Sequence, residues 1–285
     1  MKPVENRSTW AATAWGRATR AHERSRREAA TAEQNEVIAA KTGSSVHLRL
    51  AETHRRMAAC HLSTAILQES YARRAASWAA EDGGSPRFMS GVAEACGTSS
   101  ATLALLGSDH TQLAFAASDT PSQTAQDLEF ILGEGPCKDA AEQQRPVHLS
   151  GPEMVARWPG YGPALRALGI GEVAAVPLQT ADLPEACLGA LAAFDPRPGL
   201  VESGALTAIG GALARTVLLD PDADPTLYGG IDHRDNVNQA AGVTSVQAGC
   251  SIADALALIK ARAFSEGVSL KQLAKAINSG QLKIA

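Results

Sequence analysis

The chain has 285 residues, of which 45% are hydrophobic and 4% are aromatic, so its cores are built mainly from Ala, Leu and Val. No stretch approaches the roughly 20 consecutive apolar residues of a membrane span. The N-terminus is charged from Lys2 onward and has no apolar run of the signal-peptide type. These features exclude the membrane-protein class and predict a cytoplasmic protein.

The net charge of −4 is unevenly distributed along the chain. Counting Lys, Arg, Asp and Glu gives +4 for residues 1–83, −10 for residues 84–230 and +2 for residues 231–285. An acidic segment is a poor surface for nucleic acid, so a contact with RNA is expected near an end of the chain. The electrostatic part of that contact should be modest.

The N-terminal region, residues 1–83, is predicted to be helical. Residues 1–30 fit either a helix or a fraying tail, and the sequence does not separate the two. Residues 45–81 are predicted to form one long, coiled-coil-like helix, because mostly apolar residues recur at spacings of three and four. These positions are Val46, Leu50, Thr53, Met57, Cys60, Thr64, Leu67, Tyr71 and Trp78. We expect this helix to pair two chains, with packing across its own domain as the alternative.

Neither the histidines nor the cysteines form a metal-binding pattern. His47, His54 and His61 recur every seventh residue, which places neighbours roughly 10 Å apart along a helix, too far to share a metal within one chain. A partly exposed face of the same heptad is favoured over a metal or pH-sensing stripe across a dimer. The five cysteines are scattered and contain no CxxC pair, so we expect reduced, mostly packed thiols. They are Cys60, Cys96, Cys137, Cys187 and Cys250.

The middle region, residues 84–221, follows a linker at 81–86 and is predicted to be α+β. Helices are expected over 88–96 and 200–219, with a helical turn over 163–168, while 121–128 fits a loop or a helix. Strands are expected over 101–106, 112–117, 147–150, 173–179 and 187–194. Strands in a meander with helices at its beginning and end predict an antiparallel sheet with helices on one face.

The C-terminal region, residues 232–285, follows a linker over 222–231 and divides into three short helices. The first is expected over 234–246. The second starts after Ser251, which has Asp254 as its capping partner, and ends near 265. The third starts after Ser269, with Gln272 as its partner, and ends near 278. So small a unit is expected to lean on a partner helix or on a dimer.

A set of motifs in the middle region resembles the GAF family of sensor domains. The residues that carry the resemblance are Leu132-Gly133-Glu134-Gly135-Pro136-Cys137-Lys138-Asp139-Ala140, Arg145-Pro146-Val147, Arg157-Trp158-Pro159, Leu168-Gly169-Ile170, Ala175-Val176-Pro177-Leu178 and Leu188-Gly189-Ala190-Leu191. The resemblance implies a small-molecule ligand, whose binding residues the sequence does not give. Gly133, Gly135 and Pro136 fit a tight turn into a helix with Glu134 near its start. Gly189 indicates close packing or a bulge.

The C-terminal region resembles the ANTAR family of RNA-binding modules over residues 232–282. The matching positions are Arg234, Val237, Ala240, Gly242, Ala255, Lys260, Ala263, Phe264, Leu270, Ala274 and Ile277. The chain departs from the family pattern at Ala241, where a lysine is frequent, and at Val243 and Thr244, which weaken an apolar pair. The lost lysine implies weaker binding or a different RNA.

Eight residues are candidate RNA contacts. Arg234, Lys260, Arg262, Lys271 and Lys275 would touch phosphates, with solvated surface lysines as the alternative interpretation. Phe264 would stack on an unpaired base or pack in the core. Ala240 and Gly242 would let a backbone approach closely because they are small.

The resemblances together imply a regulator of transcription after initiation. In that hypothesis the GAF-like domain senses a signal, the chain forms a homodimer, and two ANTAR-like modules bind tandem RNA stem-loops as an antiterminator. The rivals are a DNA-binding regulator and a sensor or interaction protein whose C-terminal helices only dimerise. We find no catalytic constellation and expect neither an enzyme nor a cofactor.

Overall fold

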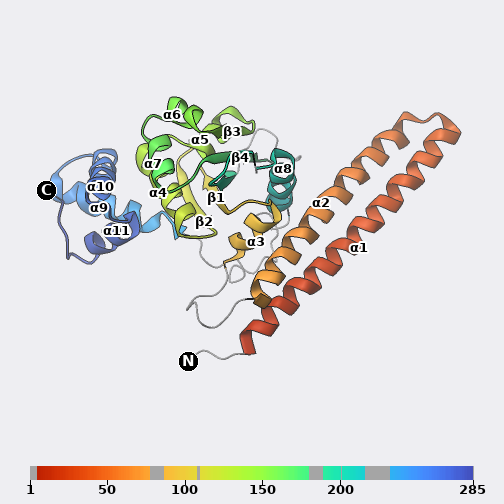
Figure 1. The fold of residues 1–285 in the computed structure, drawn as a ribbon, viewed down its shortest axis with the longest axis horizontal. Coiled ribbons are helices and arrows are strands. Elements are labelled where there is room, and N and C mark those ends of the chain that lie inside the picture. The colour runs from red at the N-terminus through yellow and green to blue at the C-terminus, as the bar shows by residue number, and fades with distance from the viewer. Residues whose placement is uncertain are drawn as a thin grey trace.

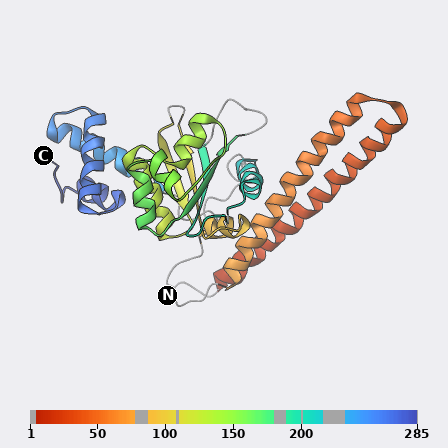
Figure 2. The ribbon, with the colours of Figure 1, turned by 45° about the horizontal axis from the view of Figure 1, so that its top comes forward.

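The computed structural model describes residues 5–77, 87–107, 110–179, 189–199, 201–215 and 232–284. Both expected linkers, Trp78 and Cys187 lie outside these residues. Figure 1 shows three parts in a row, which we call the helical hairpin, the sheet domain and the C-terminal module. The hairpin extends from one end of the sheet domain, and the C-terminal module lies at the other end (Figure 2).

The helical hairpin consists of α1 (Glu5–Thr42) and α2 (Ser45–Ser77), so the N-terminal residues from Glu5 onward are helical rather than a tail. Gly43 turns the chain between them with a φ of 69°. A seam of buried alanines, many of them seven residues apart, lets the two helices approach closely. This alanine seam contains Ala11, Ala18, Ala32 and Ala39 of α1 and Ala51, Ala65 and Ala72 of α2.

The histidines at every seventh position of α2 lie in the contact with α1. His54 Nδ1 is 2.6 Å from Glu28 Oε2, and His47 Nδ1 is 2.7 Å from Asn35 Oδ1. His61 is partly buried, and burial lowers the pKa of its imidazole. All three histidines are partly exposed, as expected, and they lie beside the alanine seam rather than on the apolar heptad face.

The apolar heptad face of α2 divides into two halves. Leu67 and Tyr71 are buried in the core shared with α3 and α8, so this half packs across its own domain. Val46, Leu50 and Met57, nearer the tip of the hairpin, are 53%, 41% and 37% exposed. Packing of α1 on the alanine seam thus leaves the outer half of the heptad face without cover among the described residues.

The sheet domain contains a sheet of strand order β3-β4-β5-β1-β2-β6, in which every pair of neighbours is antiparallel. All five expected strands are present. Gly189 confirms the expected close packing, because a Cβ on it would lie 1.9 Å from the carbonyl oxygen of Ala104. The strands are β1 (Ser100–Leu106), β2 (Gln112–Ala117), β3 (Val147–Ser150), β4 (Glu172–Leu178), β5 (Gly189–Asp195) and β6 (Asp232–His233).

Helices cover both faces of the sheet, which corrects the expectation of a single covered face. One face packs against α3 (Phe88–Ala95), α8 (Ser203–Leu213) and the end of α2. The other packs against α4 (Thr120–Leu132), α5 (Pro136–Gln143), α6 (Pro152–Arg157) and α7 (Tyr161–Ala167). The reason is visible in β5, where Leu191 faces the first core and Phe194 the second, with no polar residue between them.

The C-terminal module contains α9 (Asp235–Ala248), α10 (Ile252–Glu266) and α11 (Leu270–Asn278). The expected caps are confirmed: Ser251 Oγ accepts from the Asp254 amide at 3.1 Å and Ser269 Oγ from the Gln272 amide at 3.2 Å. Among the described helices, no single one is long and apolar enough to cross a membrane. Only α9 and α10 taken together, across a bend of 107°, would meet that length and composition.

Candidate functional site

The candidate RNA contacts lie in different environments within the C-terminal module. Ala240 is fully buried in the core between the three helices, so its small size serves packing inside the module. Gly242 lies on a partly exposed side of α9, and a Cβ placed there would meet nothing within 4 Å. Gly242 therefore leaves open space on the surface, and its approach to a partner backbone stays a prediction.

Arg234 joins the module to the sheet domain. Its Nη1 donates to Asp127 Oδ1 of α4 at 2.7 Å, and its Nε donates to Gln112 Oε1 of β2 at 2.8 Å. Its guanidinium carbon lies 4.5 Å from the ring centroids of both Phe115 and Phe130, within cation–π range. The side chain is 2% exposed. The predicted phosphate contact is incompatible with this arrangement, because the guanidinium is enclosed by two rings and a carboxylate.

Lys260 is a second cation at this junction. Its Nζ donates to the carbonyl oxygen of Phe130 at 2.5 Å and lies 3.9 Å from the centroid of that ring. Burial, and then the positive charges of Arg234 and Lys138, lower the pKa of Lys260 to about 8. A contact between Lys260 and RNA stays a prediction, and it requires the ammonium to leave Phe130.

Lys260 and Arg262 point to nearly opposite sides of α10. Two residues correspond to about 200° around a helix, so their side chains do not share a face. Phe264, four residues after Lys260, lies on the α4 side and lines a cavity of about 330 Å³ with residues of that helix. One RNA strand lying along a single face of α10 therefore cannot touch all three side chains.

The cations that remain accessible lie on α10 and α11. Lys271 and Lys275 are exposed and, four residues apart, share one face of α11. Arg262 is 35% exposed and forms an ion pair of 2.9 Å with Glu266, one turn further along α10. Of the predicted RNA contacts, Ala240 and Arg234 are thus buried and Lys260 is held against Phe130. Lys271, Lys275 and Arg262 are accessible.

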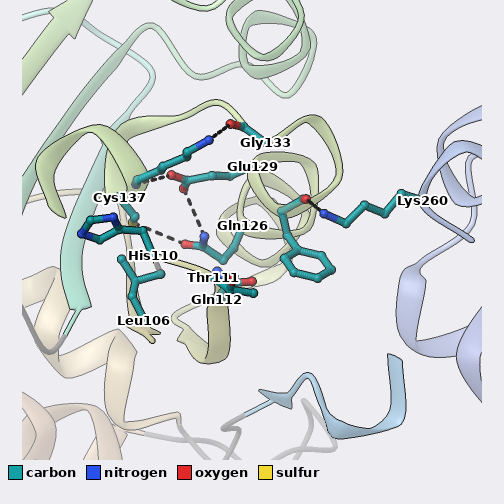
Figure 3. Close-up of a pocket in the computed structure, with 11 residues that line it drawn as sticks. Leu106, His110, Thr111, Gln112, Gln126, Glu129, Gly133, Cys137 and Lys260 are labelled. Atoms are coloured by element: carbon teal, nitrogen blue, oxygen red, sulfur yellow. Dashed lines mark hydrogen bonds between the residues drawn. The ribbon is translucent and has the colours of Figure 1, made fainter. Parts of the chain in front are cut away.

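A cavity of about 190 Å³ lies where α4, α5 and the turn between β1 and β2 meet α10 (Figure 3). We call it the junction cavity. Leu106 and Phe130 give it apolar walls, and Lys138 and Lys260 bring two ammonium groups to it. Gln126, Glu129 and Cys137 come from the sheet domain's own buried polar cluster, so the cavity connects that cluster with the C-terminal module.

Glu129 organises the buried polar cluster. Its Oε1 accepts the backbone N–H of Lys138 at 2.8 Å, and its Oε2 accepts from Gln126 Nε2 at 3.1 Å. Burial raises the pKa of Glu129 to about 7, although these hydrogen bonds oppose the shift. A Cβ on Gly135 would lie 2.5 Å from Glu129 Cγ, which explains why glycine stands there. Cys137 donates to Gln126 Oε1 at 3.6 Å and is buried, as predicted.

Two of the motifs singled out in the sequence, residues 132–140 and 157–159, contact each other in the sheet domain. Asp139 Oδ2 accepts from Arg157 Nε at 2.7 Å and from Trp158 Nε1 at 3.2 Å. Glu134 Oε1 accepts the backbone N–H groups of Gly160 and Tyr161 at 2.6 and 2.7 Å. Glu134 stands near the start of α5, as predicted, but its Oε1 accepts from the start of α7.

Sequence reasoning missed the residues of the sheet domain that receive the module. Gln112 and Asp127 lie 122 and 107 residues before Arg234 in the sequence. Phe115 belongs to the same strand as Gln112, and Phe130 to the same helix as Asp127. No local pattern links such distant positions. The low aromatic content of 4% makes each phenylalanine noteworthy, but it does not show which of them contact Arg234.

No group of three or more His, Cys, Asp or Glu residues placed to hold a metal occurs in the part of the chain that the structure describes. Among the described residues, Cys60, Cys96, Cys137 and Cys250 form no disulfide. A scan against models of protein families and a search of curated proteins find no match for this chain.

Proposed function

We propose that the protein is an RNA-binding transcriptional regulator of the antiterminator type. The sheet domain is its GAF-like sensor and the C-terminal module its ANTAR-like RNA-binding unit. The observation that carries the proposal is a three-helix unit joined to the sheet domain through few side chains, with Lys271, Lys275 and Arg262 left accessible.

The accessible cations support binding to phosphates of a folded RNA. Lys271 and Lys275 lie on one face of α11, and Gly242 leaves open surface on α9. With so few cations, one module neutralises few phosphates, so its affinity alone is low and moderately dependent on salt. Two modules on tandem stem-loops would gain affinity through their effective concentration.

A homodimer is part of this proposal, with the outer half of the heptad face as its contact. Val46, Leu50 and Met57 are large apolar side chains exposed on one face of α2, and isologous pairing of two hairpins would bury them. Leu50→Glu should convert a dimer to a monomer in sedimentation velocity. Leu48→Glu, a similarly exposed leucine on another face of α2, is the control. A wild-type monomer at micromolar concentration would contradict the dimer.

The central test is a binding titration of the full chain at two salt concentrations against a tandem stem-loop RNA selected by crosslinking and a DNA duplex of equal length. Lys271→Ala combined with Lys275→Ala should weaken RNA binding about tenfold and lower its salt dependence. Lys41→Ala, an exposed lysine at the tip of the hairpin, is the matched control.

The same titration discriminates the rival functions. The exposed Lys271 and Gln272 in the first turn of α11, with Lys275 one turn later, favour DNA as the second candidate, since a recognition helix reads bases from its first residues. Equal or tighter binding of the duplex would support a DNA-binding regulator. Binding of neither nucleic acid would leave a sensor or interaction protein whose C-terminal helices only dimerise.

A further inference from the structure

We propose that the junction cavity is an effector site that binds a small organic carboxylate, held between the ammonium groups of Lys260 and Lys138. The ligand would therefore contact the sheet domain and the C-terminal module at once. The ligand site stands on its own observations, whereas its effect on RNA rests on the proposed function.

The charges around the cavity favour an anion. Lys138 Nζ donates to the carbonyl oxygen of Gly133 at 2.7 Å, and Lys260 Nζ donates to that of Phe130 at 2.5 Å. Both ammonium groups thus converge on the C-terminal end of α4, whose partial negative charge of about half a unit offsets only part of their charge. Within the described residues, no carboxylate oxygen lies within 4.0 Å of Lys260 Nζ, and the nearest to Lys138 Nζ is Glu142 Oε1 at 3.9 Å. A bound carboxylate would supply the missing counter-charge.

Glu129 does not cancel this excess of positive charge. Both of its oxygens already accept hydrogen bonds inside the sheet domain, and burial raises its pKa to about 7, so part of the carboxyl is neutral near pH 7. Arg234 and Lys138 both lower the pKa of Lys260, but Arg234 is itself paired with Asp127, so the charges left for an anion are those of the two lysines. Their mutual repulsion is the energy that an anion would relieve.

The size and walls of the cavity restrict the ligand. A volume of about 190 Å³ is below the range of drug-sized sites, roughly 300–1,000 Å³, so the ligand is a small metabolite. Leu106 and Phe130 offer contact to a short hydrocarbon segment, and Thr111 and Gln112 make another part of the lining polar. Short mono- or dicarboxylates fit this combination.

Occupancy should strengthen the attachment of the C-terminal module. A carboxylate between Lys260 and Lys138 links α10 to α5 and removes the repulsion between the two ammonium groups. Lys260 would then stay on Phe130 and be withheld from RNA. The ligand-bound protein should therefore bind RNA more weakly than the ligand-free protein, by the factor that the Lys260 contact contributes to RNA affinity.

The test uses the full chain with acetate, succinate and inorganic phosphate as probes and acetamide as the neutral counterpart of acetate. Binding is followed by saturation-transfer NMR and by the thermal unfolding midpoint. We expect acetate or succinate to bind and acetamide not to bind. Lys260→Met keeps the apolar stem and should weaken binding at least about tenfold, the worth of one charge-assisted hydrogen bond. Lys275→Met, an exposed lysine of the same module, should leave binding unchanged.

Lys138→Met provides a second variant that lies outside the module, and it should weaken binding in the same direction as Lys260→Met. Circular dichroism spectra equal to wild type establish that the variants fold. Failure of both carboxylates to bind wild type, or equal binding by Lys260→Met, overturns the proposal, and selective binding of phosphate overturns the carboxylate class. RNA titrations with and without succinate separate the two proposals: no RNA binding in the succinate-free titration, with succinate binding intact, contradicts only the RNA function, and RNA binding that succinate does not weaken contradicts only the effect of the ligand.

Discussion

The helical hairpin and the junction between the sheet domain and the C-terminal module are both contacts between distant segments, but they are built differently. In the hairpin, buried alanines repeat along two helices of 38 and 33 residues, and polar pairs such as His54–Glu28 are spaced among them. At the junction, Arg234 lies against the rings of Phe115 and Phe130 and Lys260 against that of Phe130, and cavities of about 190 and 330 Å³ lie against the same helix, α4.

The difference shows how each contact can respond to a change. Alanine packing along a seam has no room for rearrangement, because close-packed helices lose contact everywhere when they separate. At the junction Phe130 and Ile131 of α4 pack against the apolar core of the module, but unfilled space lies beside this contact, so we expect Arg234 and Lys260 to contribute a large part of its free energy. Local opening is expected where apolar contacts are few. The hairpin is therefore a rigid support, and the junction is the contact that a ligand can regulate.

The largest effect should come from removing the carboxylate that pairs with Arg234. Asp127→Ala leaves a guanidinium that is 2% exposed without its ion-pair partner, which costs on the order of 3–5 kcal/mol for a buried pair. We expect faster amide hydrogen exchange throughout α9–α11, with β4 and β5 unchanged. Asp235→Ala, on an exposed position of α9, is the matched control. Unchanged exchange in α9–α11 would show that Arg234 does not hold the junction.

A smaller loss of stability, located in the helical hairpin, is expected from placing a larger side chain in the alanine seam. Ala65 is fully buried, and Ala65→Leu forces extra volume between α1 and α2, which costs about 1–3 kcal/mol in a packed core. Ala59→Leu makes the same substitution on an exposed position of α2. Urea denaturation followed by circular dichroism measures both. If Ala65→Leu were no more destabilising than Ala59→Leu, the seam would not be closely packed.

The pKa of Lys260 offers a third test, with an effect confined to the junction. A docked pKa of about 8, below the ordinary 10.5, means that the undocked module binds a proton more tightly between these values. Docking is therefore fully penalised below pH 8 and becomes more favourable as the pH rises from about 8 towards 10.5.

Carbon-13 reductive methylation of the lysines, followed by NMR, reads this pKa directly. One lysine signal should titrate about two units below the others and disappear in Lys260→Arg. In Asp127→Ala, where the junction opens, the same signal should move towards its ordinary value. A normal pKa for Lys260 in the wild type would contradict its burial against Phe130.

The two contacts also differ in how far the sequence could predict them. Local patterns predicted β1 to β5, though not the two-residue β6, as well as the caps at Ser251 and Ser269 and the helix that contains Leu67 and Tyr71, because these depend on neighbours a few residues away. The alanine seam was missed, since alanine carries a weak apolar signal beside the larger Val46, Leu50 and Met57. Pairing of Arg234 with Asp127 and Phe130 depends on tertiary contacts over more than 100 residues, so no periodicity could show that a predicted RNA contact is buried.

The smallest effect is expected from the cap of α11, and it tests whether the module's own folding is separate from its attachment. Ser269 Oγ accepts the Gln272 amide, one of the N–H groups that a helix start leaves unpaired. Ser269→Ala should cost about 1 kcal/mol, as for other N-caps. Ser279→Ala, at the other end of α11, removes only a hydroxyl that donates to the Ala276 carbonyl, and should cost less.

Hydrogen exchange should quicken in α11 for Ser269→Ala and leave the methylated Lys260 signal in place. Movement of that signal would mean that the three helices and the junction form a single cooperative unit, and that the contrast between a rigid hairpin and an independently regulated junction does not hold.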